Sequence, residues 1–274
     1  MSLFDSLQSH DFGPDRCFLC AAQLDDESRS EEHVFPKWLQ KQFGIRDQRI
    51  DLLNRVPVTY RKLTIPCCKT CNNGPLSDLE RRVRRHLAAP PRELGKEERT
   101  DLFLWVSKIL YGLLYRQNTM AFDPADRTGR TILDQTDMRG FGHLHIFLQG
   151  IRRGFRYWGE TELPATLYVY ELQCPRNPAR HFDWHDSPAT TSICLRLGHR
   201  GLVMGLDGGA QEIAVGEILA RYQNRPLHPF QFEEVGAKFL YKATTAVRSP
   251  LLSFLDGEKL FCSHLGFDYP EAPS

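Results

Sequence analysis

Four cysteines in two closely spaced pairs are the residues of this chain whose type and spacing most clearly indicate chemistry. Cys17 and Cys20 form one CxxC pair, and Cys68 and Cys71 form a second, with 47 residues between the pairs. Two such pairs can close a tetrahedral zinc site of four thiolates. Cys67 is a possible substitute, but only Cys68 gives the two-residue gap. The spacing therefore predicts a structural Zn²⁺, with buried free thiols as the alternative.

A carboxylate and an imidazole stand side by side in the loop that this zinc would close. Glu32 and His33 lie in RSEEHVFPKWLQ, and Asn72 and Asn73 follow the last cysteine of the frame. A four-cysteine zinc has no open coordination position, so chemistry is expected beside it. Carboxylate and amide oxygens suit Mg²⁺ or Mn²⁺, and a free imidazole can accept a proton from an attacking water.

The strand that would carry Glu32 and His33 must end or bend at this pair. Neighbours on a regular strand point to opposite faces, and the loop before Pro36 can provide the bend. The alternative interpretation of the pair is a polar turn. The apolar residues that follow are expected to pack as core behind the strand: Val34, Phe35, Trp38 and Leu39.

Four segments together resemble a known family, the HNH or ββα-metal endonucleases. They are CFLC, EEHVFPKWL, PCCKTCNN and LSDLERRV, within residues 14–87. The resemblance implies that Glu32 binds a catalytic divalent ion and that His33 is the general base. It also implies that Asn72 is the second ligand of that ion, with the adjacent Asn73 as the fallback.

The central asparagine of the family motif has no match at its usual place, which falls near Leu63 and Thr64. The nearest asparagine upstream is Asn54. In the family this residue braces the loop that carries the base. Either Asn54 holds that role through a longer hairpin, or the role is absent here.

Charge is distributed unevenly although the net charge is only +1. Residues 36–92 contain 13 Lys and Arg against 4 Asp and Glu, whereas residues 25–32 contain five acids and one base. An acidic spot beside a basic stretch is expected of a cation site next to an anionic polymer. A solvated helix face is the alternative for the arginine run. The candidate nucleic-acid-binding residues are Lys37, Lys69, Arg81, Arg82, Arg84 and Arg85.

The elements that must position these residues follow from apolar periodicity and turn signals. Residues 75–87 are expected to form a helix and residues 88–98 a linker, which predicts domains 1–95 and 96–274. A buried helix follows over residues 100–117, interrupted by Lys108 and Gly112, and then a loop over 121–140. Strands are expected at 143–149, 165–172, 192–197 and 201–207, and helices at 212–223 and 232–247. The fold class is therefore α+β, a zinc-braced ββα-metal domain followed by a mixed α/β domain with a small antiparallel sheet.

Other groups of potential ligands are weaker candidates. His143 and His145 share one face of the expected strand, but no third ligand is near. The segment HFDWHD has ligand-like spacing at His181, Asp183, His185 and Asp186, but its polar, proline-rich surroundings favour an exposed loop. Cys174, Cys194 and Cys262 are expected to be buried thiols. No Gly-rich phosphate loop or dinucleotide fingerprint is present.

Composition limits the class of protein. The sequence contains no run of 18 apolar residues, so no membrane-spanning helix is expected. The N-terminal residues do not resemble a secretory signal. Eight cysteines then suggest a reducing cytoplasm and metal binding. The resemblance implies a metal-dependent nuclease that hydrolyses or nicks nucleic acid, with DNA favoured and RNA as the alternative, often in defence or mobile-element biology. Residues 96–274 are expected to serve recognition, regulation or assembly, including a possible homodimer or regulatory partner. The rival interpretations are a non-catalytic zinc module that binds nucleic acid and a zinc domain that docks a protein.

Overall fold

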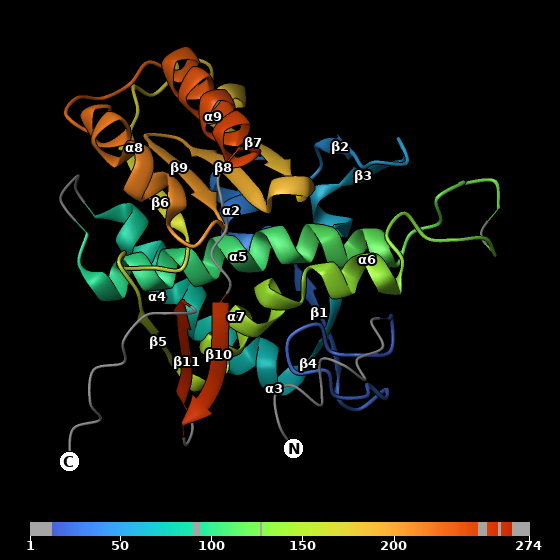
Figure 1. Cartoon of the computed structure of the whole chain (residues 1–274). Coiled ribbons are helices and arrows are strands. Elements are labelled where there is room, and N and C mark those ends of the chain that lie inside the picture. The colour runs from blue at the N-terminus through green and yellow to red at the C-terminus, as the bar shows by residue number, and fades with distance from the viewer. Residues whose placement is uncertain (1–12, 90–93, 127, 246–250, 257–258, 265–274) are drawn as a thin grey trace. The chain divides into compact units, whose positions relative to one another are not determined.

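A computed structural model of the chain has mixed helix and strand architecture (Figure 1). It describes residues 13–89, 94–126, 128–245, 251–256 and 259–264. Two compact units are present, one of residues 1–84 and 107–153 and the other of residues 85–106 and 154–274. The chain passes from one unit to the other after Arg84, after Val106, which lies inside helix α5 (Lys96–Asn118), and after Arg153. The units therefore interleave along the chain, whereas the sequence placed a single boundary near residue 95.

The first unit is built around two strands and the helix that follows them. β1 (Arg29–His33) pairs antiparallel with β4 (Thr64–Cys68), which places His33 opposite Thr64. After β4 the chain continues directly into consecutive helical elements, which are α3 (Lys69–Cys71), the π-turn η2 (Asn72–Leu76) and α4 (Ser77–Ala88). Leu79 and Val83 are buried, as the apolar spacing of the expected helix at 75–87 predicts.

The remaining small elements of the first unit lie between and after these strands. They are α2 (Lys37–Gln42), β2 (Arg49–Asp51), β3 (Pro57–Thr59), the 3₁₀ turn η1 (Tyr60–Lys62), α6 (Gln135–Gly140) and α7 (Gly142–Arg153). β2 and β3 form an antiparallel pair. The segment that runs from the end of β1 to the end of α2 contains three fully buried residues, Val34, Phe35 and Leu39. Their burial confirms the expected packing role.

Helix α5 is continuous, so the expected interruptions at Lys108 and Gly112 are wrong. Gly112 lies against Val34, just after β1, and Ile65 of β4. A Cβ atom there would lie 3.2 Å from Val34 and 3.3 Å from Ile65, tighter than ordinary packing. A glycine in this helix therefore serves close approach rather than a break.

The expected strand at 143–149 is also wrong, because these residues lie in α7. The run is apolar and short, and such runs fit a strand and a buried helix equally well. Leu144, Phe147 and Leu148 are buried at helical spacing. His143 and His145, two positions apart on a helix, do not share a face. Similarly, the expected loop at 121–140 contains the short helix α6.

The second unit contains a four-stranded sheet with the order β6-β9-β8-β7, in which every neighbouring pair is antiparallel. This confirms the small antiparallel sheet that the sequence predicts. Its strands are β6 (Thr166–Glu171), β7 (Phe182–Ser187), β8 (Ser192–Leu197) and β9 (Arg200–Gly205). The 3₁₀ turns η3 (Pro178–Arg180) and η4 (Pro188–Thr190) flank β7. Residues 182–187 thus form an edge strand, and the expected exposed loop is wrong.

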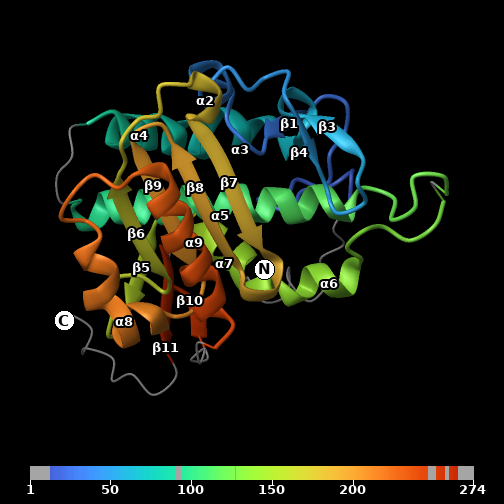
Figure 2. The same cartoon turned by 90° about the horizontal axis from the view of Figure 1, so that it is seen from above.

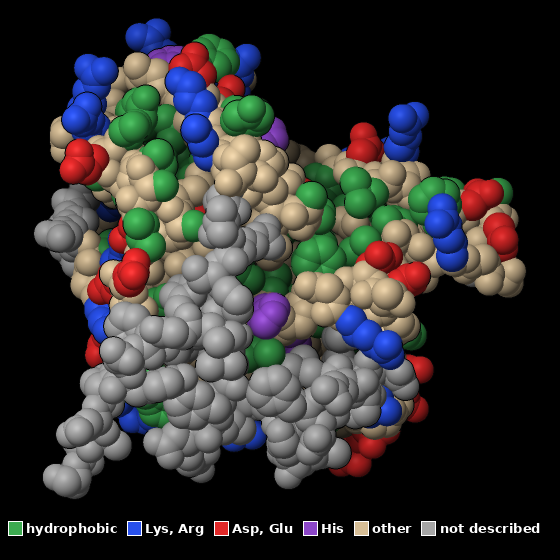
Figure 3. Space-filling view, viewed as in Figure 1, with side chains coloured by type: hydrophobic (Ala, Val, Ile, Leu, Met, Phe, Trp, Pro, Cys, Tyr) green, Lys and Arg blue, Asp and Glu red, His purple; other side chains and the backbone are tan. Residues whose placement is uncertain are grey.

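Helices α8 (Ala210–Arg221) and α9 (Pro229–Ala243) lie over one face of this sheet (Figure 2). Tyr170 and Val203 from the sheet pack with Phe232, Val235 and Phe239 from α9 in one buried cluster. The opposite side of these helices carries Lys, Arg and hydrophobic side chains together (Figure 3). Exposed large hydrophobic residues there are Ile213, Ile218, Phe230 and Tyr241.

A second, smaller sheet of this unit has the order β10-β11-β5. Its strands are β5 (Phe155–Trp158), β10 (Leu251–Asp256) and β11 (Lys259–His264), with β5 and β11 parallel. No helix among the described residues is both long enough and apolar enough to cross a membrane.

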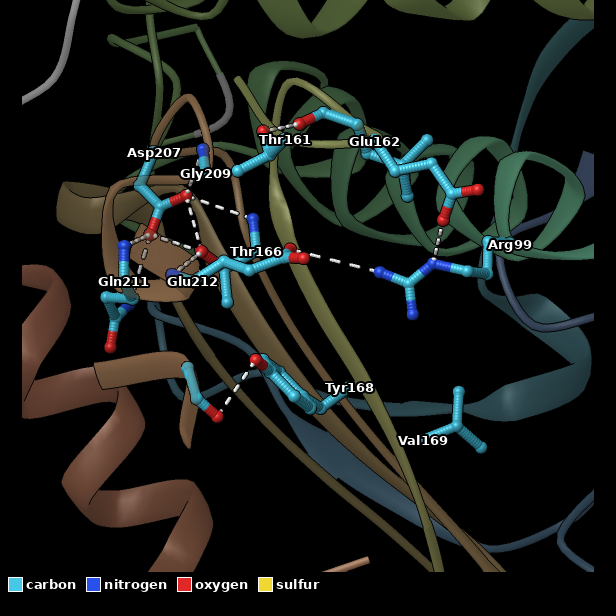
Figure 4. A network of polar contacts seen from close by, with 12 residues as sticks. Arg99, Thr161, Glu162, Thr166, Tyr168, Val169, Asp207, Gly209, Gln211 and Glu212 are labelled. Atoms are coloured by element: carbon cyan, nitrogen blue, oxygen red, sulfur yellow. Dashed lines mark hydrogen bonds and ion pairs between the residues drawn. The ribbon is translucent and has the colours of Figure 1, made fainter. Parts of the chain in front are cut away.

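A buried carboxylate fixes the turn between β9 and α8 (Figure 4). Asp207 accepts hydrogen bonds from the Thr166 and Gly209 amides at 3.0 Å and from the Gln211 amide at 3.2 Å. Gly209 has φ +80°, and a Cβ atom there would lie 2.3 Å from the Thr161 hydroxyl. These hydrogen bonds occupy the Asp207 carboxylate, so we interpret it as a structural group rather than a catalytic one.

Candidate metal centre and active site

The first cysteine knuckle is a tight turn attached to the end of β4. The Cys17 amide donates to Ala22 O at 2.9 Å, and Ala21 adopts a left-handed backbone with φ 64°. The Phe18 amide donates to Pro66 O at 2.9 Å. This bond joins the knuckle to the strand that leads into the second cysteine pair, so both pairs are held together before any metal binds.

The four thiols converge as their spacing predicts. The sulfur atoms of Cys17, Cys20, Cys68 and Cys71 all lie within 4.8 Å of one another. Cys20 Sγ and Cys68 Sγ are 3.7 Å apart, close to the roughly 3.8 Å between thiolates on a tetrahedral zinc. The Cys71 amide donates to Cys68 Sγ at 3.4 Å, which fixes the second cysteine pair as a tight turn. The cluster can therefore hold a metal such as zinc.

Cys67 lies beside this cluster and does not belong to it. Its thiol is fully buried, 3.9 Å from Cys17 Sγ, and points toward the Cys68 carbonyl oxygen at 3.5 Å. Cys67 approaches Cys17, but only Cys68 is placed with Cys17, Cys20 and Cys71 so that all four sulfur atoms lie within 4.8 Å of one another. The structure selects Cys68, in agreement with the two-residue gap.

The ionisation of these thiols shows why a cation belongs among them. Hydrogen bonds from Cys20, Cys67 and Cys71 hold the pKa of Cys17 well below its usual range. The hydrogen bond with Cys17, together with burial, raises the pKa of Cys20 to about 11, and hydrogen bonds with Cys17 and Cys20 raise the pKa of Cys71 well above its usual range. One thiolate is thus favoured at the expense of its neighbours. Four thiolates this close need a divalent cation to balance their charge.

His33 occupies the last position of β1, half-buried. Burial lowers its pKa, and the charges of Lys37 and Lys108 lower it further against the opposing effect of Glu32. The imidazole is therefore neutral near pH 7 and able to accept a proton. Its own backbone is fixed, because Lys108 Nζ donates to the His33 carbonyl oxygen at 2.7 Å.

Glu32 points to the opposite side of β1, into a buried cluster of charges. Its carboxylate forms an ion pair with Lys108, and Lys108 Nζ also lies 3.3 Å from Glu80 Oε1 on α4. The Lys108 side chain is only 1% exposed. Burial opposes its charge, but attraction from Glu32 and Glu80 outweighs burial and raises its pKa. Burial raises the pKa of Glu80 to about 7 despite Lys108.

Asn72 is brought to β1 by its position just after the last cysteine. Its amide nitrogen Nδ2 donates to Ser30 Oγ at 2.8 Å and to Glu31 O at 3.2 Å. Within the described part of the chain no hydrogen bond uses the amide oxygen of Asn72, so it can bind another group. Asn73 is exposed and makes no side-chain hydrogen bond among the described residues.

Asn54 is engaged elsewhere in the first unit. Its Nδ2 donates to Ala121 O at 2.9 Å, and its Oδ1 accepts from the Val56 amide at 3.1 Å. Both ends of this side chain therefore stabilise the turn between β2 and β3. Within the described residues it makes no contact with His33, and Lys108 is the residue that holds the His33 backbone.

The basic candidates lie on three helices: Lys37 at the start of α2, Lys69 at the start of α3, and the four arginines on α4. Lys37, Lys69, Arg84 and Arg85 are exposed, whereas Arg82 is half-buried. Arg81 forms an ion pair with Asp78 one turn earlier. Arg81, Arg84 and Arg85 have helical i, i+3, i+4 spacing and share one face of α4. That face can meet an extended anion.

The sequence interpretation missed Lys108 and Glu80 as parts of this site. The available signal was a lysine in the middle of an otherwise apolar helix, since a fully buried lysine needs a carboxylate partner. The identity of that partner was not in the sequence pattern, because Glu32 and Glu80 belong to two other elements.

The other candidate ligand groups do not form metal sites. In the described part of the chain, the four cysteines are the one group of three or more Cys, His, Asp or Glu residues placed to hold a metal. His145 Nε2 lies 3.2 Å from Leu19 O, and its ring stacks on Tyr111. Asp183 pairs with Arg196 at 3.2 Å. Cys194 and Cys262 are buried as expected, but Cys174 is exposed, contrary to expectation.

In comparisons with known proteins, no family model matches the chain, and no curated protein and no solved structure matches it significantly.

Proposed function

We propose that the first unit is a metal-dependent endonuclease of the HNH type that hydrolyses or nicks DNA phosphodiester bonds. The observation that carries this proposal is the placement of His33. It ends a strand whose partner leads directly into the cysteine cluster, Asn72 and a basic helix. Two antiparallel strands followed by a helix are the arrangement that the resemblance implies.

His33 would take a proton from the water that attacks phosphorus. A neutral, half-buried imidazole at a strand end suits this task, because general bases work best with a pKa near the working pH. The hydrogen bond from Lys108 Nζ to the His33 carbonyl oxygen keeps this residue in place and does not involve its imidazole ring. Lys108 is therefore a positioning residue for the base.

Asn72 and Glu32 are the candidate ligands of a divalent ion, with Asn73 as the alternative amide. Such an ion, when bound, would neutralise charge on the scissile phosphate and the leaving oxygen. The free amide oxygen of Asn72 supports this role. Glu32 can take part only if its carboxylate leaves the Lys108 ammonium, because a buried carboxylate shared with a lysine has already been neutralised.

The exposed arginines of α4 support an anionic substrate. Contacts to phosphates by Lys and Arg depend on counterion release and weaken as salt rises. We propose DNA as this substrate, with RNA as the alternative. The same proposal gives the second unit a role in target choice or assembly. It also gives the protein a role in defence or mobile-element biology.

Plasmid cleavage tests this function. Purified protein is incubated with supercoiled DNA and with RNA in Mg²⁺, Mn²⁺ or EDTA, and His33→Ala is compared with wild type. His143→Ala is the matched control, because His143 is exposed and outside the site. We expect metal-dependent nicking that His33→Ala reduces by about 100-fold or more and His143→Ala leaves unchanged. Equal activity of wild type and His33→Ala would overturn the assignment.

A second candidate function is a zinc module that binds nucleic acid without cutting it. The burial of Glu32 against Lys108 favours it, because this carboxylate is not presented to an ion in the structure. This function predicts salt-dependent binding to DNA, no cleavage with any metal, and no change in binding for His33→Ala.

A further inference from the structure

A hollow in the second unit is lined by arginines and has no part in the proposed nuclease site. It has a volume of about 620 Å³ and lies between the segment that follows β6 and the start of α9. Cavities of this size hold small molecules or one group of a larger ligand. The charged residues that line it are Arg176, Arg180, Arg196 and Glu233.

Two of these arginines have no side-chain partner among the described residues. Arg176 and Arg180 are exposed and make no ion pair or side-chain hydrogen bond in the described part of the chain. With Arg196 they contribute three positive charges against one negative charge from Glu233. Asp183 is a second carboxylate on Arg196, so the three arginines and two carboxylates keep an excess of one positive charge, to which the unpaired Arg176 and Arg180 contribute.

Arg196 differs from its two neighbours because it is built into the sheet. It lies on β8 with its side chain 8% exposed, and pairs with Glu233 at 2.8 Å and with Asp183 at 3.2 Å. Arg196 thus lines the cavity as a guanidinium that two carboxylates already hold in place. The charge available to a ligand comes mainly from Arg176 and Arg180, with Arg196 fixed beside them.

We propose that this arginine cavity binds the phosphate group of a phosphorylated ligand. Guanidinium groups are planar forks that bind phosphate through paired, charge-assisted hydrogen bonds. The start of the 15-residue helix α9 borders the same cavity and adds the partial positive charge of a helix N-terminus. The ligand is either a small phosphorylated molecule or the 5′-phosphorylated end of a nucleic-acid strand. The site stands independently of the nuclease proposal.

The test measures binding of defined probes to the full chain at constant ionic strength. Isothermal titration calorimetry with inorganic phosphate is run on wild type and on Arg176→Gln/Arg180→Gln. The matched control is Arg221→Gln/Arg225→Gln, which removes the same charge from exposed arginines of the same unit outside the cavity. We expect the cavity variant to bind phosphate about ten-fold or more weakly and the control to match wild type.

Two oligonucleotides of one sequence, with and without a 5′-phosphate, identify the source of the phosphate. Preference for the phosphorylated strand, lost in the cavity variant, assigns the site to strand ends. Binding of inorganic phosphate without that preference assigns it to a small molecule. Absence of phosphate binding to wild type, or equal weakening by the cavity and control variants, would overturn the proposal. Circular dichroism of both variants checks that the fold is retained.

Discussion

One cation between two carboxylates occurs in each unit, and the two clusters differ in exposure. Lys108 in the first unit is 1% exposed, with Glu32 at 9% and Glu80 at 20%. Arg196 in the second unit is 8% exposed, but its partners Asp183 and Glu233 are 42% and 39% exposed. The first cluster is closed, whereas the second opens onto solvent and a cavity.

The difference teaches what each cluster can do. In a closed cluster water cannot replace a lost partner, so the charges fix one arrangement of β1, α4 and α5. In the open cluster water or a ligand can replace a partner, so the same charges remain available for binding. This is why we assign Lys108 a positioning role and Arg196 a binding role.

The largest effect is expected from the cysteine frame, which in the described part of the chain belongs to the first unit. If the frame holds zinc, Cys68→Ser should lose that zinc and, with it, hydrogen-exchange protection in β1, β4 and α4. Structural zinc contributes on the order of 10 kcal/mol to small zinc domains. Cys67→Ser is the adjacent control and should retain one zinc per chain by elemental analysis. Retention of zinc by Cys68→Ser together with its loss in Cys67→Ser would reverse the assignment of ligands.

A smaller effect is expected when each central cation is removed. Lys108→Met should lower the free energy of unfolding by about 3–5 kcal/mol, because it leaves a buried carboxylate uncompensated. Arg196→Met should lower it by about 1 kcal/mol, because its partners can be hydrated. Denaturant unfolding of both variants measures the difference. Adding Glu32→Gln and Glu80→Gln to Lys108→Met should recover most of the loss, and equal losses for the two single variants would remove the distinction.

The smallest effect is a pH dependence specific to the closed cluster. Burial raises the pKa of Glu80 from 4.5 to about 7 in the folded state. A carboxyl that holds its proton more tightly when folded stabilises the fold below pH 4.5, and this contribution is lost as the pH rises to 7. Relative to Glu80→Gln, wild type should lose up to about 3 kcal/mol over that range. Curves of unfolding free energy against pH that stay parallel for wild type and Glu80→Gln would contradict the raised pKa of Glu80.

Much of the scaffold follows from local patterns in the sequence. The paired cysteine spacing identifies the four thiols that converge, and apolar periodicity locates α4, β6, β8 and β9. Residues 143–149 and 181–186 show where such patterns fail. A short apolar run does not distinguish strand from buried helix, and an edge strand that is polar on its exposed side resembles a loop.

The sequence by itself determined the four cysteines that can hold a metal, the three strands β6, β8 and β9, and the adjacency of Glu32 and His33. These features depend on residues near one another along the chain, where spacing and backbone geometry limit the possible arrangements. Only the tertiary structure decided that Glu32 faces Lys108, that Lys108 holds the His33 carbonyl, and that Asn54 braces another turn. The physical reason is that buried charges and amides take whichever partners the packing of distant elements brings to them.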